Sequence, residues 1–303
     1  MIYAVTGAAG FIGSHLAEAL TSAGHEVVGF DCFTDYYDPA LKEENASGLD
    51  VHRVDLAEDE LDFAGLDGVF HLAGQPGVRS FGDVFPLYLR RNVLASQRVF
   101  EAAARDGVRI VFASSSSIYG AAERYPTPED TEPRPLSPYG ITKLACEHLA
   151  GAYAREFGLD CVTLRYFNAF GPRQRPDMAF TRIVFALAAG TRFDLYGDGE
   201  QSRGWTYVAD VVDATVAAME RGTGTYNVGG AIESSMNETI ALLEQISGRT
   251  LDLSREPAVP GDQRRTRADT TRIRNELGWE PRSSLEDGLR RQWEWASSRV
   301  GAS

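Results

Sequence analysis

Residues 2–31 of this 303-residue chain read IYAVTGAAGFIGSHLAEALTSAGHEVVGFD. The run Ile2–Thr6 is apolar, and a glycine-rich turn follows it. Ser14–Ala23 then has the apolar spacing of a helix and ends before a glycine, where helices commonly stop. Glu26–Phe30 is a second apolar run, and it ends at Asp31. This order predicts a strand, a helix and a second strand parallel to the first, which is the βαβ unit.

The turn between the first strand and the helix carries Gly7, Gly10 and Gly13. Glycines at this spacing permit a tight turn, a close approach of backbone to a diphosphate, and close packing of helix on strand. The diphosphate would lie at the helix N-terminus, where unpaired N–H groups and the helix dipole favour anions. Asp31 closes the second strand, where a carboxylate can accept both hydroxyls of a ribose and would repel a 2′-phosphate. The sequence therefore predicts NAD rather than NADP.

Strands and helices continue to alternate after this unit, which predicts an α/β fold with a doubly wound parallel sheet and ligands at the C-terminal ends of its strands. We expect further strands at Val51–Val54, Gly68–Leu72, Arg109–Ala113 and Cys161–Arg165, and helices at Asn92–Arg105 and Ser137–Phe157. The pattern changes after about residue 168. We expect residues 1–167 plus about 204–230 to form the NAD-binding domain, and about 168–203 plus 231–303 to form a smaller lobe.

Composition excludes several classes of partner. The net charge is −13 and the isoelectric point is about 4.9, so binding to nucleic acid or to a membrane surface is not expected. No stretch approaches about 18 apolar residues, so no transmembrane helix is expected. Cys32, Cys146 and Cys161 lack metal-ligand spacing, so we expect no metal site, and an odd, sparse set of thiols is typical of a cytoplasmic protein.

Tyr139 and Lys143 are four residues apart and would share one face of a helix. A lysine ammonium beside a phenol favours the phenolate, which can act as a base near neutral pH. The hydroxyl run Ser114–Ser117 follows a predicted strand, and a hydroxyl there could pass a proton between a substrate and the tyrosine. On its own, a Tyr-x-x-x-Lys match is a weak signal, because most such pairs merely share a solvated helix face.

Together these motifs resemble those of the extended short-chain dehydrogenase/reductase superfamily, which includes the NAD-dependent epimerases and dehydratases. Matches occur in order from Met1 to about Trp293, at Thr6–Gly13, Asp31, Asp55-Leu56, His71–Gly74, Asn92, Ser114–Gly120, Tyr139–Lys143 and Tyr166–Pro172. The resemblance implies a Rossmann domain with a C-terminal substrate lobe. It also implies NAD contacts from Gly7, Gly10, Phe11, Ile12, Gly13, Asp31, Asp55, Leu56, Leu72, Ala73, Gly74, Asn92, Ser114, Tyr139, Lys143 and Tyr166.

Within that superfamily the chain looks like a nucleotide-sugar 4-epimerase. In that group the residue four before the tyrosine that ends the serine run is catalytic, which is Ser115 here, acting with Tyr139 and Lys143. Sugar 4,6-dehydratases carry an Asp–Glu pair at the positions of Ser116 and Ser117, and UDP-glucuronate decarboxylases place a glutamate nearby. This chain has no carboxylate at those two positions. Loss of water, or protonation after loss of CO2, needs an extra acid, whereas oxidation and re-reduction of a carbinol does not.

Two stretches resemble the UDP-glucuronate 4-epimerases in particular, namely Asp31–Pro39 (DCFTDYYDP) and Gly171–Ala179 (GPRQRPDMA). In that group an arginine contacts the uronate carboxylate, and the matching position is Arg175. A bidentate guanidinium–carboxylate pair would fix orientation. As alternatives, Arg175 is a solvated or diphosphate-binding arginine and the tyrosines of the first stretch only pack their loop. The resemblance implies substrate contacts from Arg79, Ser115, Ser116, Ser117, Asn168, Arg175, Arg203 and Asp262.

The resemblance thus implies NAD-dependent C4 epimerisation of a UDP-sugar, with UDP-glucuronate and UDP-galacturonate as the expected pair and a transient 4-keto intermediate. The alternatives are a UDP-glucose/galactose 4-epimerase, a UDP-uronate decarboxylase or dehydratase, and a non-catalytic NAD sensor. A homodimer through the Asn92–Arg105 and Ser137–Phe157 helices is expected from the family. The sequence leaves open which of Arg264, Arg265 and Arg267 faces the diphosphate.

Overall fold

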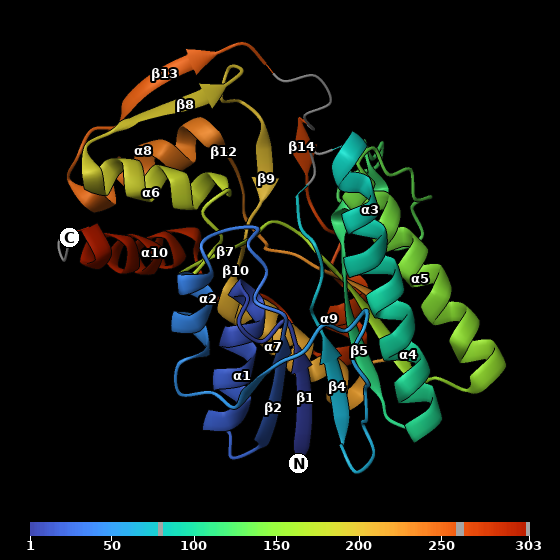
Figure 1. The fold of residues 1–303 in the computed structure, drawn as a ribbon. Coiled ribbons are helices and arrows are strands. Elements are labelled where there is room, and N and C mark those ends of the chain that lie inside the picture. The colour runs from blue at the N-terminus through green and yellow to red at the C-terminus, as the bar shows by residue number, and fades with distance from the viewer. Residues whose placement is uncertain (78–80, 259–263, 301–303) are drawn as a thin grey trace.

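The centre of the structure is a seven-stranded sheet in which paired strands all run parallel (Figure 1). The computed structural model describes residues 1–77, 81–258 and 264–300. The strand order is β11-β6-β5-β4-β1-β2-β3, so the winding direction changes between β1 and β4 and leaves a crevice there. The predicted doubly wound sheet is confirmed. Its strands are β1 Ile2–Thr6, β2 Glu26–Asp31, β3 Val51–Arg53, β4 Gly68–His71, β5 Ile110–Ser115, β6 Cys161–Tyr166 and β11 Thr225–Val228.

Helices cover both faces of this sheet, which is why β4 and β5 are buried along their whole length. On one face, Leu16 and Val212 pack with Val5 in a common apolar core. On the other, Val99 and Cys146 pack with Ala4 and its neighbours. The first face is covered by α1 (Phe11–Ser22), α7 (Val208–Arg221) and α9 (Thr271–Leu277), and the second by α4 (Ala95–Asp106) and α5 (Pro138–Phe157).

Some helix boundaries differ from the predicted ones. Helix α1 begins at Phe11 instead of Ser14, because the chain turns at Gly10. The helix expected from Asn92 begins earlier, with α3 (Phe85–Tyr88) and a π-helical turn, η2 (Leu89–Leu94), before α4. Helix α2 (Pro39–Ala46) was not predicted, although it carries a recognised start signal: the Asp38 side chain accepts the Ala40 N–H, and proline occupies the first position.

A smaller α/β lobe lies above the C-terminal edge of the sheet in Figure 1 and has its own apolar core, which includes Phe180, Phe193 and Leu243. It contains α6 (Ala179–Ala189), α8 (Met236–Ser247), α10 (Leu285–Val300), and the short strands β7 (Ala169–Phe170), β8 (Arg192–Tyr196), β9 (Ser202–Gly204), β10 (Thr206–Tyr207), β12 (Glu233–Ser235), β13 (Asp252–Glu256) and β14 (Arg265–Thr266).

The expected division into domains stays a prediction. Helix α9 lies within residues 231–303, which were expected in the lobe, yet its Ile273 packs into the core on the main sheet. None of the helices in the described part of the chain combines the length and the apolar content that a membrane crossing requires.

Candidate active site

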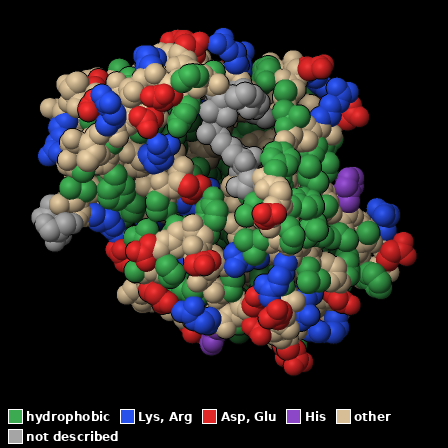
Figure 2. Space-filling view, turned by 45° about the horizontal axis from the view of Figure 1, so that its top comes forward, with side chains coloured by type: hydrophobic (Ala, Val, Ile, Leu, Met, Phe, Trp, Pro, Cys, Tyr) green, Lys and Arg blue, Asp and Glu red, His purple; other side chains and the backbone are tan. Residues whose placement is uncertain are grey.

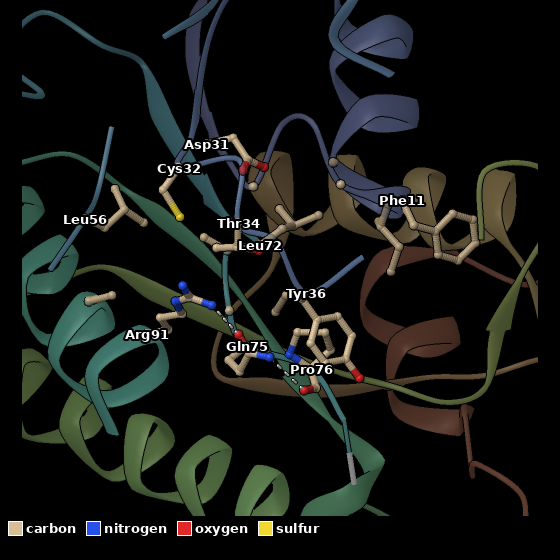
Figure 3. A pocket seen from close by; sticks show the side chains of 18 of the residues that line it. Phe11, Asp31, Cys32, Thr34, Tyr36, Leu56, Leu72, Gln75, Pro76 and Arg91 are labelled. Atoms are coloured by element: carbon tan, nitrogen blue, oxygen red, sulfur yellow. Dashed lines mark hydrogen bonds between the residues drawn. The ribbon is translucent and has the colours of Figure 1, made fainter. Parts of the chain in front are cut away.

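A pocket opens at the C-terminal ends of β1, β2, β4 and β5, in the crevice where the winding direction changes (Figure 3). All but one of the residues expected to contact NAD line it. They are Gly7, Gly10, Phe11, Ile12, Gly13, Asp31, Asp55, Leu56, Leu72, Ala73, Gly74, Ser114, Tyr139, Lys143 and Tyr166. The exception is Asn92. It lies buried behind the pocket, where its Oδ1 accepts the Gln75 N–H at 2.6 Å and its Nδ2 donates to Thr142 Oγ1 at 3.0 Å.

The glycine turn is built without room for side chains. Gly7 has a φ of +73°, which favours glycine, and a Cβ on Gly13 would lie 2.0 Å from the Gly7 carbonyl oxygen. Gly10 caps α1 without any side-chain hydrogen bond, whereas Ser137 caps α5 with its hydroxyl. The N-terminal N–H groups of α1 therefore border the pocket without a side-chain cap, an arrangement that suits a diphosphate.

Asp31 lies at the end of β2, on the pocket wall, where its carboxylate accepts the N–H groups of Phe33 at 2.8 Å and Ala9 at 3.3 Å. The ammonium of Lys42 lies 3.9 Å from this carboxylate and donates to Thr34 Oγ1 at 2.7 Å. Burial lowers the pKa of Lys42, and the charge of Asp31 opposes that shift. Lys42 lines the same pocket and was not predicted as a site residue.

Tyr139 and Lys143 lie at the start of α5, which Ser137 fixes by accepting the Gly140 N–H at 3.1 Å. The Lys143 ammonium is buried and donates to the carbonyl oxygen of Ala113, in β5, at 2.8 Å. The same nitrogen lies 5.9 Å from the centroid of the Tyr139 ring. The two side chains thus converge on the pocket, with the cation fixed by the main chain of the central sheet.

The serine run turns away from the sheet immediately after β5. The Ser115 hydroxyl accepts the Ser117 N–H at 3.1 Å and lies 3.1 Å from the Ser117 hydroxyl, and Ser116 begins a 3₁₀ turn, η3 (Ser116–Tyr119). Ser114 lines the pocket beside Tyr139, whereas the next three serines lie beyond its lining.

The other residues expected to bind substrate, apart from Ser115–Ser117, divide into three groups. Arg175 lines the pocket. Asn168 and Arg203 lie in the smaller lobe outside the pocket lining, where Asn168 Nδ2 donates to Gly204 O at 3.1 Å and Arg203 Nη1 donates to Ser202 O at 2.8 Å. Two further candidates lie outside the described residues, namely Arg79 and Asp262.

Two of the three arginines near β14 are held in ion pairs on the lobe. Arg264 pairs with Asp198 at 2.8 Å, and Arg265 pairs with Glu233 through two hydrogen bonds, at 2.8 and 2.7 Å. Arg267 makes no ion pair with any residue in the described ranges, and which of the three arginines faces a diphosphate stays open.

The loop that carries Arg175 is fastened to helix α1. Arg173, at a φ of +63°, donates to both carboxylate oxygens of Glu18, at 2.7 and 2.6 Å, and to Nδ1 of His15 at 2.9 Å. The other ring nitrogen of His15 donates to Pro172 O at 2.9 Å. Burial and the Arg173 charge lower the pKa of His15 to about 4, so the ring is neutral and can accept from the guanidinium.

The sequence of residues 3–229 matches the model of the NAD dependent epimerase/dehydratase family. The chain belongs to this family. The family identification expected from the motifs is confirmed, and the matched segment contains both the glycine turn and the Tyr139–Lys143 pair.

Individual members of the family resemble the chain over nearly its whole length. The uncharacterized UDP-glucose epimerase YtcB of Bacillus subtilis (strain 168) is 40% identical over 97% of each chain. The UDP-glucuronic acid 4-epimerase of Bacillus cereus, solved with UDP-glucuronic acid and NAD, is 38% identical, with a TM-score of 0.94 over 99% of this chain and 100% of that one. MoeE5 is 41% identical to this chain in two solved complexes with NAD. The complex with UDP-glucuronic acid has a TM-score of 0.89 over 99% of this chain and 100% of that one. The complex with UDP-glucose has a TM-score of 0.88 over 100% of both chains.

In this family member a buried ion pair stands behind the serine run. Glu147 accepts hydrogen bonds from Arg165 Nε at 3.1 Å and Nη2 at 2.8 Å, and from the Ser114 hydroxyl. Arg165 Nη1 also donates to the Tyr119 hydroxyl at 2.7 Å. A carboxylate therefore does lie beside the serines, and its oxygens accept hydrogen bonds from the Arg165 guanidinium and the Ser114 hydroxyl. Glu147 was missed, although its spacing from Tyr139 places both on one face of α5.

Proposed function

We propose that the protein is an NAD-dependent UDP-sugar 4-epimerase that interconverts UDP-glucuronate and UDP-galacturonate. The observation that carries the proposal is that Arg175 lines the same pocket as Tyr139 and Lys143. The pair Tyr139–Lys143 supplies a base for a carbinol, and the guanidinium supplies a partner for a carboxylate on the same substrate. The names of the relatives, which include epimerases of UDP-glucose and of UDP-glucuronate, agree with this substrate class.

The pocket residues fit NAD. The N-terminus of α1, which has no side-chain cap, suits the diphosphate. Asp31 suits a ribose, and Asp55 and Leu56 suit a polar and an apolar contact with adenine. When bound, NAD supplies a reversible hydride acceptor for the C4 position of the sugar. We expect the cofactor to remain bound through the cycle, because the reaction has no net redox change.

Tyr139 acts as the proton acceptor and donor. Its phenolate takes the proton of the C4 hydroxyl, directly or through the hydroxyl of Ser115, and returns a proton to C4 oxygen after the 4-keto sugar has presented its other face. The hydrogen bond to Ala113 O holds the Lys143 ammonium in place beside Tyr139. Ser114 and Ser115 are aligned with β6, since they pair in register with Arg165 and Tyr166.

Arg175 binds the carboxylate at C5 and controls its direction. A 4-keto uronate is a β-keto acid, and it loses CO2 when the bond from C5 to the carboxylate lies parallel to the π orbital of the carbonyl. A bidentate contact can hold the carboxylate away from that alignment. Positions 116 and 117 carry hydroxyls and no acid, which agrees with an isomerisation in which the sugar loses neither water nor CO2.

A 4-epimerase for UDP-glucose and UDP-galactose is the second candidate, since one relative is named a UDP-glucose epimerase and MoeE5 was solved with UDP-glucose as well as UDP-glucuronic acid. The test is incubation of the purified protein with each UDP-sugar, without added NAD, followed by NMR and mass spectrometry. We expect UDP-galacturonate of unchanged mass from UDP-glucuronate. Turnover of UDP-glucose alone would replace the proposal with the second candidate, and a product lacking CO2 would identify a decarboxylase.

The Arg175 assignment has its own test. Arg175→Ala should weaken the binding of UDP-glucuronate in calorimetric titration and leave UDP-glucose binding unchanged, whereas Arg290→Ala, on the exposed face of α10, should change neither. Wild-type affinity and turnover of the Arg175 variant with UDP-glucuronate would refute the carboxylate contact.

We also propose a homodimer through α4 and α5. On the right of Figure 2, apolar side chains gather over the region of α3 to α5. Phe157 is 66% exposed, and Leu89, Leu94 and Ile141 are each about half exposed. Light scattering of the purified protein should give twice the mass of the chain, and an Ile141→Glu variant should shift it toward the monomer.

A further inference from the structure

The two stretches that resemble UDP-glucuronate 4-epimerases lie far apart in the sequence but meet in space. The Tyr36 hydroxyl, in the first stretch, donates to Asp177 Oδ2, in the second, at 3.3 Å. Tyr36 and Arg175 both line the pocket. The hydroxyl of Tyr36 also lies close to Gly77, in the loop after β4, since a Cβ added to Gly77 would lie 2.9 Å from it. Burial and the Asp177 charge raise the pKa of Tyr36, so its hydroxyl keeps its proton and remains a donor.

Asp177 binds the guanidinium of Arg175 along one edge. Its Oδ1 accepts from Arg175 Nε at 3.0 Å and its Oδ2 accepts from Nη2 at 3.1 Å. A guanidinium offers a second bidentate edge, formed by the two terminal nitrogens. Among the residues that the structure describes, none accepts a hydrogen bond from Arg175 Nη1. The edge that suits a substrate carboxylate is therefore available while the other edge is held.

The loop that presents this pair is anchored just before Arg175, to the smaller lobe by Gln174 and to helix α1 by Arg173. Gln174, only 3% exposed, donates to Ala169 O at 2.9 Å, and its own oxygen accepts from Thr181 Oγ1 at 3.0 Å. The preceding residue, Arg173, is bonded to helix α1. Because the backbone on the N-terminal side of Arg175 is anchored, the direction of its guanidinium depends mainly on Asp177 and on what holds Asp177.

We propose that Asp177, oriented by Tyr36, is a positioning residue that aims the free edge of Arg175 at the carboxylate of the uronate. The inference rests on the proposed function and specifies how the carboxylate is kept out of line with the 4-keto group. If the guanidinium tilts, the C5–carboxylate bond can align with the carbonyl π orbital. That bond then breaks, its electron pair moves into the C4 carbonyl to give the enolate, CO2 leaves, and a proton adds at C5.

The test uses the full-length protein with Asp177→Asn, which keeps the shape of the side chain and removes its charge. With UDP-glucuronate, we expect kcat for epimerisation to fall and the share of product that has lost CO2 to rise about fivefold, the factor typical of a partly exposed ion pair. The variant loses the ion pair that orients Arg175, which weakens binding, and loses a negative charge beside the substrate carboxylate, which strengthens it. KM should therefore change little. Tyr36→Phe should move the product share in the same direction by a smaller factor. Calorimetric titration with UDP-glucose should give wild-type affinity for both variants.

A matched control is Asp252→Asn, which removes the carboxylate of the Arg192–Asp252 pair at 3.6 Å on β13 of the lobe and should leave product share and melting temperature unchanged. Tighter binding of UDP-glucuronate by the Asp177 variant with an unchanged product share would overturn the inference, because Asp177 would then compete with the substrate for Arg175. An unchanged product share beside an impaired Arg175→Ala variant would overturn the inference alone. If Arg175→Ala is itself unimpaired, the carboxylate contact of the proposed function fails first.

Discussion

Replacement of Arg165 by methionine tests the buried charge network behind the serine run. Arg165 makes four hydrogen bonds: two to the Glu147 carboxylate, one to the Tyr119 hydroxyl, and one to the Glu129 carbonyl oxygen at 2.9 Å. The side chains of Arg165 and Glu147 are only 9% and 11% exposed. Methionine would leave a nearly buried carboxylate whose remaining polar side-chain partner, among the described residues, is Ser114. Removing one partner of such a pair costs about 3–5 kcal/mol, so we expect Arg165→Met to lower the free energy of unfolding by that amount.

Substitution of the partner, Glu147, and the double variant give the sign of the coupling between the two side chains. Glu147→Leu should also be costly, since it leaves the guanidinium buried without its carboxylate. The double variant Arg165→Met with Glu147→Leu should cost less than the two single changes together, because an apolar pair leaves no unpaired charge. Arg290→Met removes an exposed partner of Glu286 and should cost no more than about 0.5 kcal/mol.

Urea unfolding measures these energies. The transition should be followed by circular dichroism and by tryptophan fluorescence, and the two curves must coincide for a single unfolding free energy to be defined. A loss below about 1 kcal/mol for Arg165→Met, or strict additivity in the double variant, would show that the network is not a coupled unit and would refute the reasoning.

Three further predictions concern the pocket and its surroundings. Gly13→Ala should abolish NAD binding in calorimetric titration and lower the melting temperature, because its Cβ would lie 2.0 Å from Gly7 O; full NAD affinity would contradict this. Tyr139→Phe should reduce turnover about 10²–10⁴-fold while retained NAD, measured after denaturation, stays at the wild-type level. His15→Gln should reduce the loss of unfolding free energy at acid pH. The pKa of His15 is about 4 in the folded chain and near 6.5 when unfolded, so its contribution to stability is full above pH 6.5 and falls by up to about 3 kcal/mol as the pH drops to 4. Equal slopes of unfolding free energy against pH for variant and wild type would contradict the assignment.

Much of the pocket could be predicted because its residues sit on local patterns. The apolar runs of β1, β2 and β5 are each followed by glycine or a short polar residue, and parallel strands bring those ends to one edge. Gly7, Asp31 and Ser114 were located in this way and do line one pocket. The contact expected from Asn92 stays a prediction, since that side chain bonds to Gln75 and Thr142 behind the lining.

The residues that were missed depend on long-range packing. Lys42 reaches Asp31 only because α2, which begins at the Asp38-Pro39 signal, folds back over the end of β2. In the lobe, β8 and β13 pair as parallel strands although nearly 60 residues separate them, and neither has the apolar run of a central strand. The contact between Tyr36 and Asp177 has no local signature either, because a hydrogen bond between two loops appears only once both domains are in place.

The path of the main chain between the two parts of the molecule bears on how such proteins can change over generations. After β6 the chain enters the lobe, returns to the main sheet for α7 and β11, enters the lobe again for β12 and α8, and returns once more for α9 before ending in α10. A single exchange of gene segments at one crossing point therefore cannot replace the whole of the smaller lobe. New sugar preferences in this architecture are expected to arise through point changes in short loops such as residues 171–177, and gene shuffling should rarely contribute.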